Sequence, residues 1–67
     1  MFCRFTFIPD GSVLIYQGQP GETYEDALLS FGINPDAALL FSGGRSLPQD
    51  KKIEEEEVGI FLTSSRG

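Results

Sequence analysis

The chain has 67 residues, with ten acidic and five basic side chains, no histidine and one cysteine, so its formal net charge is −5. This length allows one domain near the lower limit at which a hydrophobic core outweighs chain entropy. The negative charge argues against binding of nucleic acid or an anionic membrane, because phosphate recognition needs clustered lysines and arginines. We therefore expect a protein partner, for which a basic surface would be complementary.

The residue types give little basis for enzymatic chemistry. Without histidine or a second thiol, the sequence offers no activated nucleophile and no metal site, so we expect a non-enzymatic protein that needs no cofactor. Cys3 fits a small core residue on a strand. Neither a signal peptide nor an apolar run of about 20 residues is present, which predicts a cytoplasmic protein, and we expect a monomer.

The N-terminal residues predict a β-hairpin. In FCRFTFI (2–8), Cys3, Phe5 and Phe7 alternate with residues that point to the other face, which is the period of a half-buried strand. That second set consists of Phe2, Arg4, Thr6 and Ile8. The residues of 9–11, Pro-Asp-Gly, suit a turn, and SVLIYQ (12–17) predicts the returning strand.

The segment GETYEDALLSFGI (21–33) predicts a helix of two to three turns. Thr23 is placed to cap its first turn, and Gly32 is placed to end it in a left-handed conformation. Acidic Glu25 and Asp26 suit the positive end of the helix dipole. One apolar stripe is spaced i, i+3, i+4 and i+7 and consists of Tyr24, Ala27, Leu28 and Phe31.

The second half predicts three more strands. Because Pro35 disfavours helix at the residue before it, ALLFS (38–42) follows as an inner strand, and the glycines at 43–44 suit a hairpin turn into RSL (45–47). Pro48 ends that strand at an edge, and Ile53 is expected to fill the core from a polar loop. VGIFLT (58–63) is the last strand.

The order β-β-α-β-β-β predicts an α+β fold in which one helix packs on one face of a mixed sheet. The first and last strands would pair in parallel at the centre. Residues 1–62 would then form the domain, and 63–67 a flexible tail.

This order and several fixed positions resemble the ubiquitin-like β-grasp proteins of the ThiS, MoaD and small archaeal modifier type. The resemblance is carried by the capped helix 21–33, by GGRSLPQD (43–50) and by IEEEEVGIFLTSSRG (53–67), and it covers essentially the whole chain. It implies that an ATP-dependent, ubiquitin-activating-type enzyme adenylates the terminal carboxylate. That carboxylate then becomes a thiocarboxylate for a sulfur-accepting enzyme, or is joined to a lysine of a target protein.

By this resemblance, Gly67 is the site of covalent attachment at the end of the tail Ser64, Ser65 and Arg66. A residue without Cβ fits a narrow channel and leaves its carbonyl open to attack. The family ends in Gly-Gly, so Arg66 is a departure. Three readings stay open: the enzyme has an acidic groove, the tail is not activated, or the natural end differs. The alternative function is a β-grasp module that binds partners without a covalent bond, with an inert tail.

Three further features carry expectations. If Ala38, Leu40, Ile60 and Leu62 face the helix, an exposed patch forms on the open face of the sheet from Leu39, Phe41, Phe61 and Phe2. Family members dock their activating enzyme through that face; a second layer, a homodimer or a register shifted by one residue would remove the patch. Lys51 and Lys52 are possible conjugation acceptors, and four glutamates at 54–57 predict a solvated loop rather than a metal site.

Overall fold

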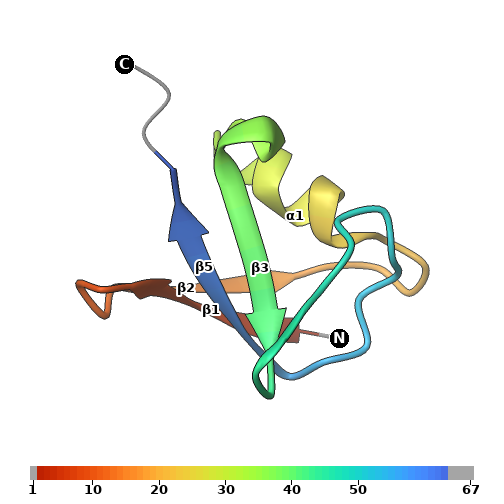
Figure 1. Cartoon of the computed structure of the whole chain (residues 1–67). Coiled ribbons are helices and arrows are strands. Elements are labelled where there is room, and N and C mark those ends of the chain that lie inside the picture. The colour runs from red at the N-terminus through yellow and green to blue at the C-terminus, as the bar shows by residue number, and fades with distance from the viewer. Residues whose placement is uncertain (1, 64–67) are drawn as a thin grey trace.

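The computed structural model describes residues 2–63 and contains one five-stranded sheet crossed by one α-helix (Figure 1). Its elements in chain order are β1 (Phe2–Ile8), β2 (Val13–Gln17), α1 (Tyr24–Ser30), the 3-10 helix η1 (Pro35–Ala37), β3 (Ala38–Ser42), β4 (Arg45–Ser46) and β5 (Glu57–Leu62). The predicted order is therefore confirmed. Leu47, expected in the fourth strand, follows it instead, because Pro48 cannot continue the ladder.

The strands are ordered β2-β1-β5-β3-β4 across the sheet. β1 and β5 pair in parallel at its centre, with Phe5 opposite Val58, and the other neighbouring pairs are antiparallel. Both glycines of the β3–β4 turn, Gly43 and Gly44, have positive φ values of 60° and 79°, as the two-residue hairpin turn requires. The N-terminal and C-terminal strands thus secure each other, as the sequence predicted.

Helix α1 has defined signals at both ends. At its start, the Thr23 hydroxyl accepts from the backbone N–H of Asp26 (3.2 Å), and the Asp26 carboxylate accepts from the backbone N–H of Thr23 (2.9 Å), which completes a capping box. At its end, Ile33 N–H donates to the Leu28 carbonyl (2.9 Å), and Gly32 takes a φ of 76°. The predicted cap residues therefore both act as caps.

The core lies between α1 and one face of the sheet. Its buried hydrophobic residues are Cys3, Phe5, Tyr24, Ala27, Leu28, Ala38, Leu40, Ile53, Val58 and Ile60. Phe31 closes one side by edge-to-face contacts with Phe5 and Tyr16, at ring-centroid distances of 5.5 and 5.9 Å. Leu62, expected to join this layer, is 48% exposed because it lies at the end of β5.

Candidate functional site

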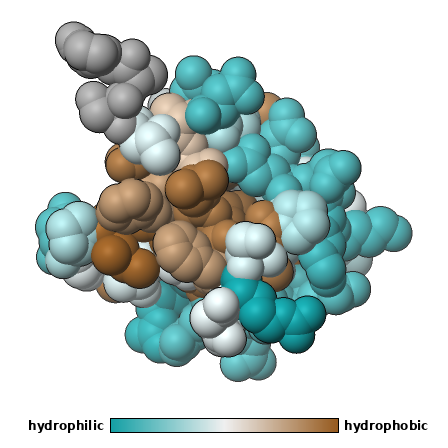
Figure 2. Space-filling view, viewed as in Figure 1, coloured by the Kyte–Doolittle hydropathy of each residue, from teal (hydrophilic) through white to brown (hydrophobic). Residues whose placement is uncertain are grey.

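The face of the sheet opposite the helix carries a row of exposed apolar side chains. The strand register places Ile8 opposite Phe61 and Phe61 opposite Leu39, so one residue from each of β1, β5 and β3 stands in line. These side chains are 45%, 42% and 54% exposed, respectively. Figure 2 shows hydrophobic side chains gathered over this part of the sheet.

Phe41 extends this row by one step along β3. It is half-buried and pairs with Gly59, where a Cβ would lie 3.1 Å from Ile8 Cδ1. Because Gly59 has no side chain, the Ile8 side chain can pack directly against β5 at this position. We call Ile8, Leu39, Phe41 and Phe61 the apolar patch.

Sequence reasoning identified three of these residues and missed Ile8. Alternation along β1 did assign Ile8 to the open face. Its contact with the patch depends on the parallel register between β1 and β5, however, which brings residues 53 positions apart side by side. Gly59, which has no side chain, was the signal in the sequence that could have indicated this contact of Ile8.

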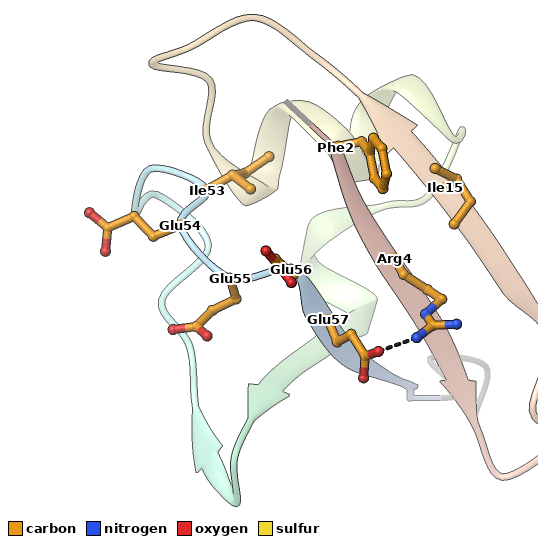
Figure 3. Close-up of a pocket in the computed structure, with 8 residues that line it drawn as sticks. All are labelled: Phe2, Arg4, Ile15, Ile53, Glu54, Glu55, Glu56 and Glu57. Atoms are coloured by element: carbon orange, nitrogen blue, oxygen red, sulfur yellow. Dashed lines mark hydrogen bonds and ion pairs between the residues drawn. The ribbon is translucent and has the colours of Figure 1, made fainter.

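Phe2, which was expected in the same patch, lies elsewhere on the open face. It stands at the opposite end of β1 from Ile8, about 20 Å away at the usual rise of a strand. Between them, Arg4 makes an ion pair with Glu57 (Figure 3). Phe2 therefore belongs to a second surface, a hollow of about 630 Å³.

One wall of this hollow is the acidic segment Glu54–Glu57, whose position is fixed from the core. The buried Tyr24 hydroxyl accepts from the backbone N–H groups of Glu54 and Glu55, each at 3.1 Å. The backbone N–H of Arg4 donates to the backbone carbonyl of Glu56 (2.8 Å). Within residues 2–63, no group of three or more acidic or cysteine side chains is arranged to hold a metal ion.

The two candidate acceptor lysines differ in their surroundings. Lys51 Nζ donates to the Glu54 carboxylate (2.6 Å), and this hydrogen bond raises the pKa of Lys51 and lowers that of Glu54. Lys52 is exposed, pairs through its backbone with Thr23, and makes no ion pair within the part of the chain that the structure describes.

Thr63, the first residue of the expected tail, is hydrogen-bonded to the neighbouring strand segment. Thr63 donates its backbone N–H to the Ala37 carbonyl (2.8 Å), which prolongs the pairing beyond β5. Ser64, Ser65, Arg66 and Gly67 lie outside the described residues. Thr63 follows Phe61 by two residues, so the described chain ends beside the apolar patch.

Cys3 is fully buried under the sheet, on the side of the helix. Burial, together with the negative charges of Glu55 and Glu57, raises the pKa of its thiol from 9.0 to about 11. The thiol therefore stays protonated near neutral pH and serves as a core side chain. No helix within residues 2–63 is long and apolar enough to span a lipid bilayer.

Comparisons with known proteins concern the fold. No family model matches the chain, and no curated protein matches it. Among solved structures, it is similar to a computationally designed protein based on human erythrocytic ubiquitin, with a TM-score of 0.68, 20% identity and coverage of 98% of this chain and 95% of the other. It is also similar to the ubl5 domain of the polyubiquitin locus of T. thermophila, with a TM-score of 0.66, 20% identity and coverage of 97% and 93%. The chain therefore has the ubiquitin-like β-grasp fold.

Proposed function

We propose that this protein is a ubiquitin-like carrier whose Gly67 carboxylate is activated by a separate ATP-dependent adenylating enzyme. A carboxylate oxygen attacks the α-phosphorus of ATP and displaces pyrophosphate, which leaves an acyl adenylate. Hydrosulfide or a lysine amine then attacks the carbonyl carbon, loses a proton and expels AMP. The product is a thiocarboxylate or an amide bond to a target protein.

The observation that carries this proposal is the shared location of the apolar patch and the end of β5. Pairing of Leu62 with Ala38, and of Thr63 with Ala37, holds the chain to the sheet as far as its last described residue. An enzyme docked on the apolar patch would thus lie next to the point from which residues 64–67 continue. Ile8, Leu39 and Phe61 are each more than 40% exposed, and neighbouring exposed apolar side chains are typical of protein-binding surfaces.

If chains are conjugated to one another, we propose Lys52 rather than Lys51 as the acceptor. Only an unprotonated amine attacks an acyl adenylate, and the hydrogen bond to Glu54 favours the protonated form of Lys51. Lys52, which makes no ion pair among residues 2–63, is not held in this way.

The test measures ATP–pyrophosphate exchange and the mass of the protein after incubation with its cognate adenylating enzyme, ATP and a sulfur donor. We expect exchange and a mass increase on Gly67, both lost when residues 64–67 are deleted. Phe61→Asp should raise the KM for the carrier, whereas Leu29→Asp, the same change at a residue of α1 that is 56% exposed, should not. No exchange with the full chain would reject activation.

A second candidate function is a non-covalent interaction module, which the apolar patch favours independently of the tail. In that case Phe61→Asp abolishes partner binding and activity, and deletion of residues 64–67 leaves both intact. The carrier instead loses activity on that deletion while its fold is retained.

A further inference from the structure

A second surface of the sheet, separate from the apolar patch, combines apolar side chains with negative charge. Figure 3 shows Phe2 on β1 and Ile15 on β2 on one side of the hollow, and the segment from Ile53 to Glu57 on the other. Phe2 is 60% exposed and Ile15 is 52% exposed, while Ile53 is buried at the edge of the core. The hollow thus offers apolar surface that no residue of the described chain covers.

The charges around this hollow determine what it would bind. Glu54–Glu57 and Arg4 are among its lining residues and together carry a formal charge of −3. The carboxylate of Glu54 points away from Phe2 and Ile15 (Figure 3). Glu57 is already paired with Arg4, and Glu54 with Lys51. Glu55 accepts from the Ser42 hydroxyl (3.4 Å). Within residues 2–63, the carboxylate of Glu56 makes no hydrogen bond or ion pair.

We propose that this hollow binds a basic segment of a partner protein, with an arginine that lies over Phe2 and reaches Glu56. An arginine suits both features, because its planar guanidinium stacks on an aromatic ring and also pairs with a carboxylate. Its aliphatic stem, with a neighbouring apolar residue, would cover Ile15 and the rim at Ile53. The segment would not extend to the apolar patch, since the Arg4–Glu57 pair lies between the two surfaces.

The anchoring of the acidic wall supports this assignment. Tyr24 fixes the backbone at Glu54 and Glu55, and the hydrogen bond from Arg4 fixes it at Glu56. The carboxylate of Glu56 is therefore presented from an ordered backbone, so that less conformational entropy is lost when a cation binds.

The experiment titrates the full 15N-labelled chain with the blocked tetrapeptide Leu-Arg-Leu-Arg and with its citrulline counterpart, which has the same shape without the charge. We expect the arginine peptide to shift the amide resonances of Phe2, Arg4, Ile15 and residues 53–57, and the citrulline peptide to shift none. Glu56→Gln should weaken binding about threefold to fivefold, as for an exposed ion pair. Phe2→Leu, which keeps the apolar contact but removes the ring, should also weaken it.

Glu25→Gln is the matched control, because it changes the net charge equally but lies on the exposed side of α1. It should leave the affinity unchanged, and so should deletion of residues 64–67, which makes the result independent of the carrier function. Equal binding of both peptides would overturn the proposal. So would shifts centred on the apolar patch, or equal losses for Glu56→Gln and Glu25→Gln.

Discussion

Replacement of Tyr24 by phenylalanine tests how the acidic segment is attached to the core. The Tyr24 side chain is fully buried, and its ring makes an edge-to-face contact with Phe5 at a centroid distance of 6.4 Å. Phenylalanine keeps this packing and removes only the hydroxyl. The backbone N–H groups of Glu54 and Glu55, which donate to that hydroxyl at 3.1 Å, then lose their acceptor.

The expected loss follows from the number and exposure of these donors. One hydrogen bond contributes about 1 kcal/mol to stability, and an unpaired buried donor costs about 1–3 kcal/mol. Because Glu54 and Glu55 are exposed residues, water can replace part of what is lost. We therefore expect Tyr24→Phe to lower the free energy of unfolding by about 1–2 kcal/mol for the two bonds together. In a domain of this size each kcal/mol lowers Tm by about 4–8 °C.

Denaturant unfolding measures the total loss, and amide hydrogen exchange locates it. The amides of Glu54 and Glu55 should lose more protection than those of β5. Tyr16→Phe is the matched control: its hydroxyl donates to the Glu22 carboxylate (2.6 Å) in a less buried place, so its removal should cost less. The reasoning is refuted if Tyr24→Phe costs under about 0.5 kcal/mol and exchange at Glu54 and Glu55 is unchanged.

Three further predictions concern the core and one loop. Leu40→Ala should cost about 2–4 kcal/mol in a denaturant titration, whereas Leu39→Ala should cost under about 1 kcal/mol, because Leu40 is 2% and Leu39 is 54% exposed. Gly18→Ala should lower stability by about 1–2 kcal/mol, because its Cβ would lie 2.5 Å from Tyr16 Cε2 and force the ring aside. Cys3 should resist alkylation at pH 8 in the folded protein, since the pKa of its thiol is raised from 9.0 to about 11. The raised pKa also means that the free energy of unfolding, fully present below pH 9, decreases as pH rises through 11.

Each of these three predictions would be contradicted by a specific result. A larger cost at Leu39 than at Leu40 would mean that β3 turns its other face to the core, and equal costs would contradict the difference in their burial. An alanine at residue 18 that leaves the unfolding midpoint unchanged would mean that the loop has room for a side chain. Rapid alkylation of the folded protein, or an alkaline loss of stability that Cys3→Ala does not reduce, would contradict the burial of the thiol.

Prediction from the sequence succeeded where local chemistry determines structure. The Thr23 cap, the Gly32 stop and the Gly43–Gly44 turn each act through residues that are neighbours in the chain, so their patterns can be read directly. The alternation in β1 likewise predicted the shared face of Cys3 and Phe5, which are both buried. Alternation failed for Leu62, which is exposed at the end of β5, and it grouped Phe2 with residues that lie elsewhere on the sheet. The reason is that alternation assigns a residue to a face of the sheet, but gives neither its position along the strand nor its distance from other residues on that face.

The sequence by itself determined the elements, their order and the faces of the strands, because hydrophobic periodicity and capping residues act over a few positions. Only the tertiary structure decided that Ile8 joins Leu39, Phe41 and Phe61, and that Phe2 instead faces the acidic segment. Both results depend on the parallel register of β1 with β5, which is set by the packing of residues more than 50 positions apart. No local pattern specifies that register, so the two surfaces appear only when the sheet is assembled.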